Sequence, residues 1–277
     1  MNTVSQPLLE LDEVVVEYPG GGRSKPAIQV LHGVSLSIAR GETLGLVGES
    51  GSGKTTLGRA VLGLAPITGG EIRYQGRPIS RLGKRERREL AKDIQVVFQD
   101  PYTSLNPAMT VMDILAEPLL VTGVSRADAE RRVRDLLDRV YLPHDAARRL
   151  PREFSGGQRQ RIAIARALCR DPKVIVCDEP VSALDLSTQA RVLDLFVEIQ
   201  EATGVSYLFV THDLSVVRRI SHRVAVLNRG DIVETGDAAV ITGNPEHPYT
   251  RRLLLAATVP DPERQARRRA ERQAVDV

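Results

Sequence analysis

GESGSGKT, residues Gly48 to Thr55, directly follows the apolar run Thr43–Val47. Its spacing is that of a phosphate-binding loop, in which a glycine, four residues and a second glycine precede a lysine and a hydroxyl residue. Gly51 and Gly53 allow backbone angles that turn successive N–H groups inward, and the helix expected from Lys54 points its positive end at the same anion. A glycine-rich turn that binds nothing is the alternative. A strand before the loop and a helix after it favour a site for a nucleoside triphosphate, ATP or GTP.

Two side chains of this loop suit a triphosphate with its metal. Lys54 supplies a positive charge for the β- and γ-phosphates, and the Thr55 hydroxyl is a ligand for Mg²⁺. The expected nucleotide-binding segment is Gly48, Glu49, Ser50, Gly51, Ser52, Gly53, Lys54, Thr55 and Thr56.

The composition is that of an ordinary globular protein, with 277 residues of which 42% are hydrophobic and 26% charged. A net charge of +3 is too small to argue for nucleic acid. The start, MNTVSQPLLELDEV, lacks the features of an export signal, and no apolar run approaches the roughly 18–20 residues that cross a bilayer. Cys169 and Cys177 fall in an expected helix and an expected buried strand, and nothing pairs them as a disulfide or metal site. We expect a soluble cytoplasmic protein that is able to dock on a membrane partner.

Four short apolar runs each end at a polar residue, which predicts an α/β fold with buried parallel strands. The runs are Thr43–Val47, Ile94–Phe98, Val174–Cys177 and Tyr207–Thr211. Ligands of such sheets bind beyond the carboxyl ends of the strands. One sheet edge is therefore expected to collect Lys54, Gln99, Asp178, Glu179 and His212.

The remaining segments give weaker signals. Antiparallel strands are expected at Leu8–Val16, Val30–Ile38, Glu71–Tyr74 and Arg223–Val233, the last as a hairpin around Asn228–Asp231. Residues from about 101 to 153 are expected to be largely helical, with Ser125 capping one helix, and 189–203 and 213–220 resemble amphipathic helices. After Asp237 the chain becomes Pro-rich, and 261–277 is expected to be a solvated helix or a disordered end.

The polar residues at the strand ends suit phosphoryl chemistry. Asp178 can hold magnesium, while Glu179 can orient or deprotonate the attacking water. His212 can contact the γ-phosphate or the water, and Gln99 can reach the metal or the water. Plainer interpretations are surface charge for the two carboxylates, a structural role for the histidine and a strand cap for the glutamine.

FSGGQ, Phe154 to Gln158, is the most discriminating element. Ser155 is a natural N-cap, and Gln158 stands where a capping box requires it. Gly156 and Gly157 in the first turn cost about 1 kcal/mol each relative to alanine, so their presence suggests that something approaches the backbone closely. A helix start also favours an anion, which makes this the second anion-binding helix start of the chain.

Six linked motifs, GESGSGKT, Gln99, FSGGQ, VIVCDEP, SALD (Ser182–Asp185) and His212, stand in the order and spacing of an ATP-binding-cassette (ABC) ATPase. The resemblance covers about residues 8–255. It implies a P-loop NTPase core with a mostly parallel sheet, an antiparallel β subdomain and an inserted helical subdomain at about 100–165. The nucleotide-binding domain would be 1–255, followed by a charged tail at 256–277.

The same resemblance implies two ATP molecules with Mg²⁺ sandwiched in a head-to-tail dimer. In that family the serine–glycine–glycine segment of one subunit faces the phosphate loop of another, which here assigns Ser155, Gly156, Gly157 and Gln158 to the partner's nucleotide. Tyr18 would stack on adenine, Asp185 would lie across the dimer interface, Glu179 would be the general base and His212 would contact the γ-phosphate. Thr55, Gln99 and Asp178 are the expected metal ligands, and Gln99 would couple the site to a membrane partner.

Two further stretches, FQDPYTSLNPAMT (Phe98–Thr110) and NPEHPYTRRLL (Asn244–Leu254), resemble importer ATPases for oligopeptides, dipeptides and nickel. The implied partners are a second ATPase subunit (a copy or a paralogue), two permeases and an extracytoplasmic solute-binding protein, with no direct nucleic acid. The resemblance also implies that the chain is a peripheral subunit located at the cytoplasmic face of the inner membrane. No cysteine follows Cys177, so the iron–sulfur cluster of some relatives is not expected. Val181 and Phe154 depart mildly from the family pattern.

A soluble ABC ATPase in a non-transport complex, acting on nucleic acid, the ribosome or phosphonate breakdown, is the alternative. Such proteins often carry two cassettes or a long coiled coil, whereas this sequence has one cassette and no long heptad run. The sequence leaves the transported solute open.

Overall fold

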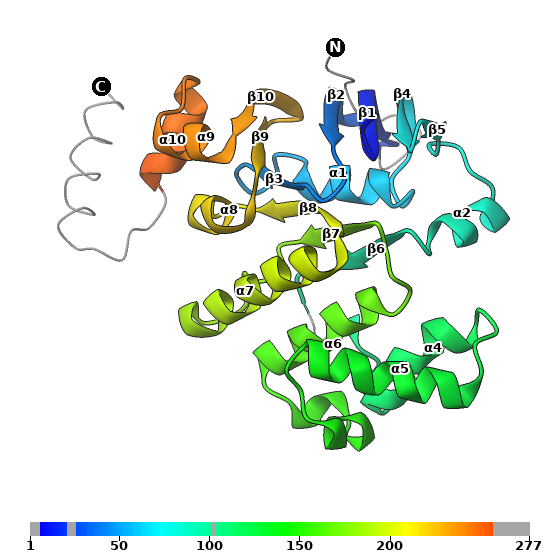
Figure 1. Cartoon of the computed structure of the whole chain (residues 1–277). Coiled ribbons are helices and arrows are strands. Elements are labelled where there is room, and N and C mark those ends of the chain that lie inside the picture. The colour runs from blue at the N-terminus through cyan, green and yellow to red at the C-terminus, as the bar shows by residue number, and fades with distance from the viewer. Residues whose placement is uncertain (1–5, 21–25, 101–103, 257–277) are drawn as a thin grey trace, which may run out of the picture. The chain divides into compact units, whose positions relative to one another are not determined.

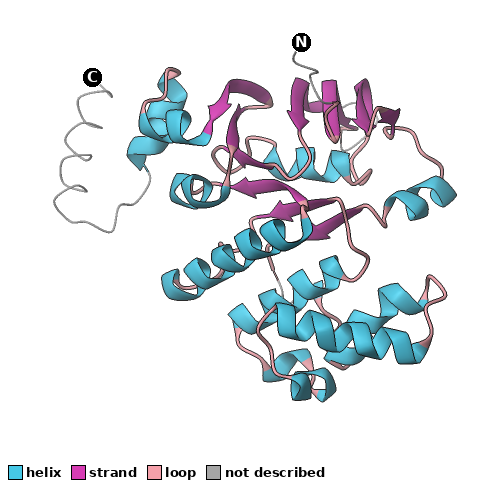
Figure 2. Cartoon of the chain, in the orientation of Figure 1, coloured by secondary structure: helices cyan, strands magenta, loops and turns pink. Residues whose placement is uncertain are grey.

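The computed structural model describes residues 6–20, 26–100 and 104–256, and the chain divides into two compact units (Figures 1 and 2). The first unit comprises Met1–Ile38, Glu42–Ser80 and Phe209–Val277, and the second comprises Ala39–Gly41 and Arg81–Leu208. Of the predicted charged tail at 256–277, residues 257–277 lie outside the described residues. Among the residues described, no helix combines the length and the apolar character needed to span a bilayer.

One sheet of the first unit is antiparallel, as predicted. Its strands, in the order β2-β1-β4-β5, are β1 (Leu9–Tyr18), β2 (Ile28–Ile38), β4 (Ile67–Tyr74) and β5 (Arg77–Pro78). In β1 the buried residues change from odd to even numbers between Leu11 and Val14, where the pairing register shifts. Such a bulge lets the strand keep its apolar side chains on one face.

The second sheet of this unit carries the phosphate loop. β3 (Thr43–Val47) pairs in parallel with β9 (Arg223–Asn228), which forms a hairpin with β10 (Asp231–Asp237). All five residues of β3 are buried, as expected of a parallel strand covered on both faces. Both hairpin turn residues, Arg229 and Gly230, have positive φ (49° and 89°), the geometry that matches strand twist in a two-residue turn. The predicted hairpin is confirmed.

The described residues of this unit contain four helices: α1 (Lys54–Val61), α8 (Leu214–Ile220), α9 (Ala238–Gly243) and α10 (Pro248–Ala256). The last two follow β10 in Figure 1, and neither was predicted from the Pro-rich sequence. Pro248 is the first residue of α10, a position where its missing N–H costs no helical hydrogen bond. Tyr249 and Leu253 of α10 pack in one buried cluster with Val47, the last residue of β3.

The second unit contains a parallel strand pair and the larger helical region. The pair is β6 (Ile94–Val97) and β7 (Val174–Asp178). The helices are α2 (Lys84–Leu90), α4 (Val111–Leu120), α5 (Arg126–Arg139), α6 (Gly156–Leu168) and α7 (Leu186–Thr203), with short 3₁₀ turns at His144–Arg148 and Pro151–Glu153. The predicted helical stretch is confirmed over its described residues, and Ser125 Oγ caps α5 by accepting the Asp128 N–H at 3.2 Å. The Arg-rich sequence of α2 was not predicted to be helical.

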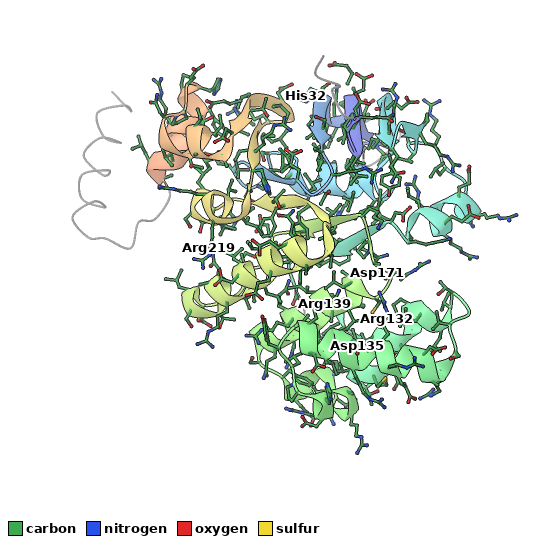
Figure 3. All side chains as sticks on the ribbon, in the orientation of Figure 1. His32, Arg132, Asp135, Arg139, Asp171 and Arg219 are labelled. Carbon is green, nitrogen blue, oxygen red and sulfur yellow. The ribbon has the colours of Figure 1, made fainter. Side chains whose placement is uncertain are left out.

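Buried contacts and a surface ion pair hold the second unit together. β8 (Ser206–Thr211) begins in this unit and ends in the first. Tyr207 of β8 packs edge-to-face on Phe196 of α7, with ring centroids 5.4 Å apart, and its hydroxyl donates to the Phe196 carbonyl at 3.1 Å. Arg132 and Asp171, labelled in Figure 3, form an ion pair. Both cysteines are unpaired and buried, and burial raises the pKa of Cys169 to about 12, which keeps this thiol protonated.

Candidate nucleotide-binding site

The phosphate loop leaves β3 after Val47 and ends where α1 begins at Lys54. Gly51 and Gly53 have φ of 81° and 109°, so both glycines adopt the backbone angles for which the sequence predicted them. Gly53 is the N-cap residue of α1, and no side chain caps this helix. The first N–H groups of α1 are therefore left without a capping side chain, as an anion-binding helix start requires.

Lys54 is folded back over its own loop. The residue is only 5% exposed, and its ammonium donates hydrogen bonds of 2.8 Å to the carbonyls of Gly48 and Glu49. These bonds keep a buried positive charge at the loop and satisfy it. The charge is thus in place before any phosphate binds.

Close contacts explain the first glycine and the shape of the loop. A Cβ at Gly48 would lie 2.1 Å from the Leu227 carbonyl oxygen and 2.7 Å from Ser52 Oγ, so only glycine fits. Gly230, in the β9–β10 turn, donates its N–H to the Ser52 carbonyl at 2.9 Å. The hairpin therefore supports the loop from a part of the sequence remote from it.

The chemistry of these residues fits a magnesium triphosphate. The Ser52 hydroxyl is buried and makes no hydrogen bond in the protein. A buried polar group without a partner calls for an explanation, and a bound ligand is one. Within the described residues no group of three or more His, Cys, Asp or Glu side chains is arranged to hold a metal ion.

The first unit also contains the predicted Tyr18 and His212. Tyr18 ends β1, is half-buried and pairs with Ile28. His212 directly follows β8, is exposed and precedes Asp213, the N-cap residue of α8. Asp213 caps that helix, since its Oδ1 accepts the Ser215 N–H at 2.8 Å. The structure thus places both predicted residues at strand ends of the unit that carries the phosphate loop.

The second unit carries the two adjacent carboxylates. Asp178 is the last residue of β7, and Glu179 follows with φ of 47°, the left-handed region that a glutamate seldom adopts. Ser182 holds this turn through its N–H and hydroxyl, which donate to the Glu179 carbonyl at 3.3 and 3.0 Å. Backbone strain of this kind, of order 1–3 kcal/mol, concentrates at functional sites. Gln99 is exposed, two residues beyond the end of β6.

The capping box predicted for FSGGQ is present. Ser155 Oγ accepts the Gln158 N–H at 3.3 Å, and Gln158 Oε1 accepts the Ser155 N–H at 3.0 Å. The glycines have a partly different explanation from the one expected. A Cβ at Gly157 would lie 2.2 Å from Cγ2 of Thr188, so the group that approaches this backbone is a methyl group of the same chain. Gly156, the first residue of α6, is half-buried.

Sequence reasoning missed a structural role for Asp185 and a contact of Tyr249. Asp185 caps α7 by accepting the Ser187 hydroxyl at 2.7 Å and the Thr188 N–H at 3.0 Å, and these bonds hold its pKa below the ordinary range. An aspartate directly before a helical pattern is the signal that would have found it. The Tyr249 hydroxyl accepts the Glu49 N–H at 2.9 Å, a contact between residues 200 apart that no local pattern encodes.

Of the residues predicted to share one sheet edge, Lys54 and His212 belong to the first unit. The others, Gln99, Asp178 and Glu179, belong to the second unit. Their convergence at one edge stays a prediction. Each unit by itself shows strand-end residues arranged as the sequence indicated.

Residues 31–182 match the family described as ABC transporter. The chain belongs to this family. "Oligopeptide transport ATP-binding protein OppD" of Mycobacterium tuberculosis is 52% identical over 237 residues, which cover 86% of this chain and 39% of the relative. "Glutathione import ATP-binding protein GsiA" of Escherichia coli is 49% identical over 265 residues, covering 94% of this chain and 42% of the relative. The chain thus spans about two fifths of the length of these relatives.

Solved structures of the family share the fold. The dimeric ATP-binding cassette MJ0796, in a post-hydrolysis state bound to ADP and Pi, superposes with a TM-score of 0.74 at 30% identity, covering 83% of this chain and 98% of that one. The predicted membership of the ABC family and the predicted mixed α/β fold are confirmed.

Proposed function

We propose that this chain is the ATP-hydrolysing subunit of an ABC importer that takes up oligopeptides, dipeptides or a related solute such as nickel. The observation that carries the proposal is the 52% identity to a protein named for oligopeptide transport, over 86% of the chain. Relatives named for glutathione import support the same class, since glutathione is itself a small peptide. No observation favours the alternative of a non-transport complex.

In this proposal the first unit binds the nucleotide. Tyr18 stacks on adenine, the loop Gly48–Thr56 surrounds the phosphates, and Lys54 turns from its two carbonyls toward the β- and γ-phosphates. His212 contacts the γ-phosphate. The start of α1, which has no capping side chain, and the buried Ser52 hydroxyl support this assignment, because a helix start favours an anion and the hydroxyl makes no hydrogen bond within the protein.

The second unit supplies the groups for hydrolysis. Glu179 acts as general base toward the attacking water, and Gln99 senses the site and links it to a permease. Mg²⁺ would be held by Thr55, Gln99 and Asp178, and when bound it would offset the negative charge of the phosphates. The strained backbone at Glu179 supports its role, since a left-handed glutamate persists only where its surroundings enforce it.

The proposed active form is a head-to-tail dimer with a second ATPase subunit, a copy or a paralogue. Ser155, Gly156, Gly157 and Gln158 of one subunit face the nucleotide of the other, and Asp185 lies at their interface. Two permeases and an extracytoplasmic solute-binding protein complete the importer, which places the subunit peripherally on the cytoplasmic face of the inner membrane. We assign 1–255 to the nucleotide-binding domain, with a helical subdomain at about 100–165, and 256–277 to a charged tail.

Glu179→Gln tests the proposed chemistry. The variant keeps the shape of the side chain and removes its basicity, so ATP affinity should stay within about twofold while turnover falls on the order of 10²- to 10⁴-fold. With turnover blocked, the ATP-bound dimer should accumulate, which light scattering during size-exclusion chromatography measures. Glu201→Gln, the same change at an exposed site of α7, is the matched control and should hydrolyse ATP normally.

Normal turnover in Glu179→Gln would remove this residue from the base role. The transport assignment has a separate test, which is purification of the tagged chain from detergent extracts. Permease subunits should accompany it, whereas ribosomes or nucleic acid in their place would contradict import.

A further inference from the structure

The last described helix of the chain reaches the phosphate loop through one hydroxyl group. Tyr249, in the first turn of α10, is 4% exposed, and its Oη accepts the backbone N–H of Glu49 at 2.9 Å. Glu49 is the second residue of the loop. Both residues belong to the first unit, so the contact lies within one compact body.

This hydrogen bond acts on the peptide group that also holds Lys54. The carbonyl of Gly48 and the N–H of Glu49 belong to one peptide unit, and the carbonyl accepts the Lys54 ammonium at 2.8 Å. The described chain has no cis peptide, and a trans peptide points its C=O and N–H in opposite directions within one plane. Tyr249 therefore fixes the plane of a peptide whose other side positions the lysine.

Tyr249 is itself held firmly on two sides. Its ring lies in the buried cluster that contains Val47 and Leu253. The chain entering α10 is fastened by Glu234 of β10, whose carboxylate accepts the N–H groups of Glu246 and His247 at 2.7 and 3.3 Å. A hydroxyl on so constrained a ring is a fixed acceptor. Burial also raises the pKa of Tyr249, which keeps the phenol neutral.

We propose that Tyr249 is a positioning residue for ATP: its hydroxyl presets the Gly48–Glu49 peptide, and through it Lys54, in the geometry that receives the triphosphate. The inference rests on the proposed ATP site and goes beyond it, because it makes the C-terminal helix part of the nucleotide-binding apparatus. A preset loop binds more tightly because less conformational freedom is lost on binding.

Tyr249→Phe removes the hydroxyl and keeps the ring. One net hydrogen bond corresponds to roughly a three- to tenfold change in an equilibrium constant, so the Kd for ATP and the KM should rise by about that factor. The loop geometry serves the bound ground state and the transition state alike, so kcat at saturating ATP should stay within about twofold. A residue with a merely structural role would lower stability without this split between KM and kcat.

Tyr207→Phe is the matched control, because it also deletes one buried tyrosine hydroxyl that bonds to the backbone, but in the second unit. We compare wild type and both variants, as full-length chains, by titration with a fluorescent ATP analogue, steady-state ATPase kinetics and urea unfolding. Hydrogen exchange of the Glu49 amide in the nucleotide-free protein gives a readout that does not depend on nucleotide. This amide should be protected in wild type and exchange faster in Tyr249→Phe only.

The outcomes separate the inference from the function on which it rests. A wild-type chain that binds no ATP analogue overturns both. A wild-type chain that binds, with an unchanged Kd in Tyr249→Phe, overturns the positioning role alone. Equal loss of affinity in both variants, or a Glu49 amide that exchanges freely in wild type, overturns it as well. A rise in Kd and KM confined to Tyr249→Phe supports it.

Discussion

The helix starts of α1 and α6 both contain glycine, and their first turns are completed in different ways. At α1, Gly53 sits in a left-handed conformation, no side chain caps the helix, and the loop leaves the Ser52 hydroxyl without a partner. At α6, Ser155 and Gln158 cap each other, and ordinary φ values suffice. The first helix start has no capping side chain, whereas the second is capped by its own residues.

This difference suits the two roles that we propose. In the proposed roles the phosphate loop binds the nucleotide of its own chain, and its helix start has no capping side chain for a phosphate to displace. The FSGGQ segment meets a nucleotide only in the dimer, and its capping box satisfies the helix end while the subunit is alone. The comparison therefore predicts that substitutions in the loop change ATP affinity, and that substitutions in FSGGQ change stability or turnover.

Lys54→Ala should have the largest effect on the loop side. Charge-assisted hydrogen bonds are worth roughly 1.5–3 kcal/mol, so removing the ammonium should weaken ATP binding by up to about 100-fold. Isothermal titration of the chain with ATP measures the change. Lys92→Ala removes an exposed lysine and should bind like wild type. Unchanged affinity in Lys54→Ala would mean that the loop is not the triphosphate site.

Gly157→Ala should have the next largest effect, on stability. The new Cβ would meet the Thr188 methyl at 2.2 Å, and overpacking of this kind costs about 1–3 kcal/mol. Urea unfolding should show the loss, and adding Thr188→Ser, which deletes that methyl, should restore most of it. Without the clash, alanine would stabilise the helix by up to about 1 kcal/mol. A gain of stability in Gly157→Ala would therefore contradict the predicted clash with Thr188.

Gly51→Ala should have the smallest effect on stability, about 1–2 kcal/mol, because φ of 81° is unfavourable for alanine although no atom lies within 4 Å of the new Cβ. Gly41, with φ of 70° and equally open space, is a matched control outside the loop. Both alanine variants should lose similar stability in urea. Only Gly51→Ala should also bind ATP more weakly, and equal affinities would remove the special role of the loop backbone.

Local signals in the sequence account for much of this structure. Five consecutive apolar or small residues predicted the buried strand β3, the glycine spacing predicted the loop angles, and Ser155 with Gln158 predicted the capping box. Each of these features depends on residues within a few positions of one another. The sequence predicted a helix from residue 189, whereas α7 begins at Leu186. The prediction was three residues late because the N-cap at Asp185 was not recognised.

The features that the sequence did not reveal depend on contacts between distant residues. The close contact with Thr188 that requires a glycine at position 157 joins residues 31 positions apart. The hydrogen bond between Tyr249 and Glu49 joins residues 200 positions apart. The helices α9 and α10 were missed because Pro245 between them and Pro248 at the start of α10 suggested turns, whereas packing against the end of β3 stabilises both helices. Tertiary packing overrides local preference at such places.

The most direct test of the account compares Ser155→Asp with Ser155→Asn. Both residues cap helices as well as serine does, so the stability of the chain should hardly change. ATP binding to the separate subunit should also stay within about twofold, because its own Ser155 faces no nucleotide. In the dimer, however, the aspartate would repel the partner's triphosphate, and ATPase activity should fall on the order of 10²-fold, while the neutral asparagine loses about tenfold or less. Equal activities of the two variants, or an Asp variant that no longer binds ATP as a separate subunit, would contradict a site shared between two chains.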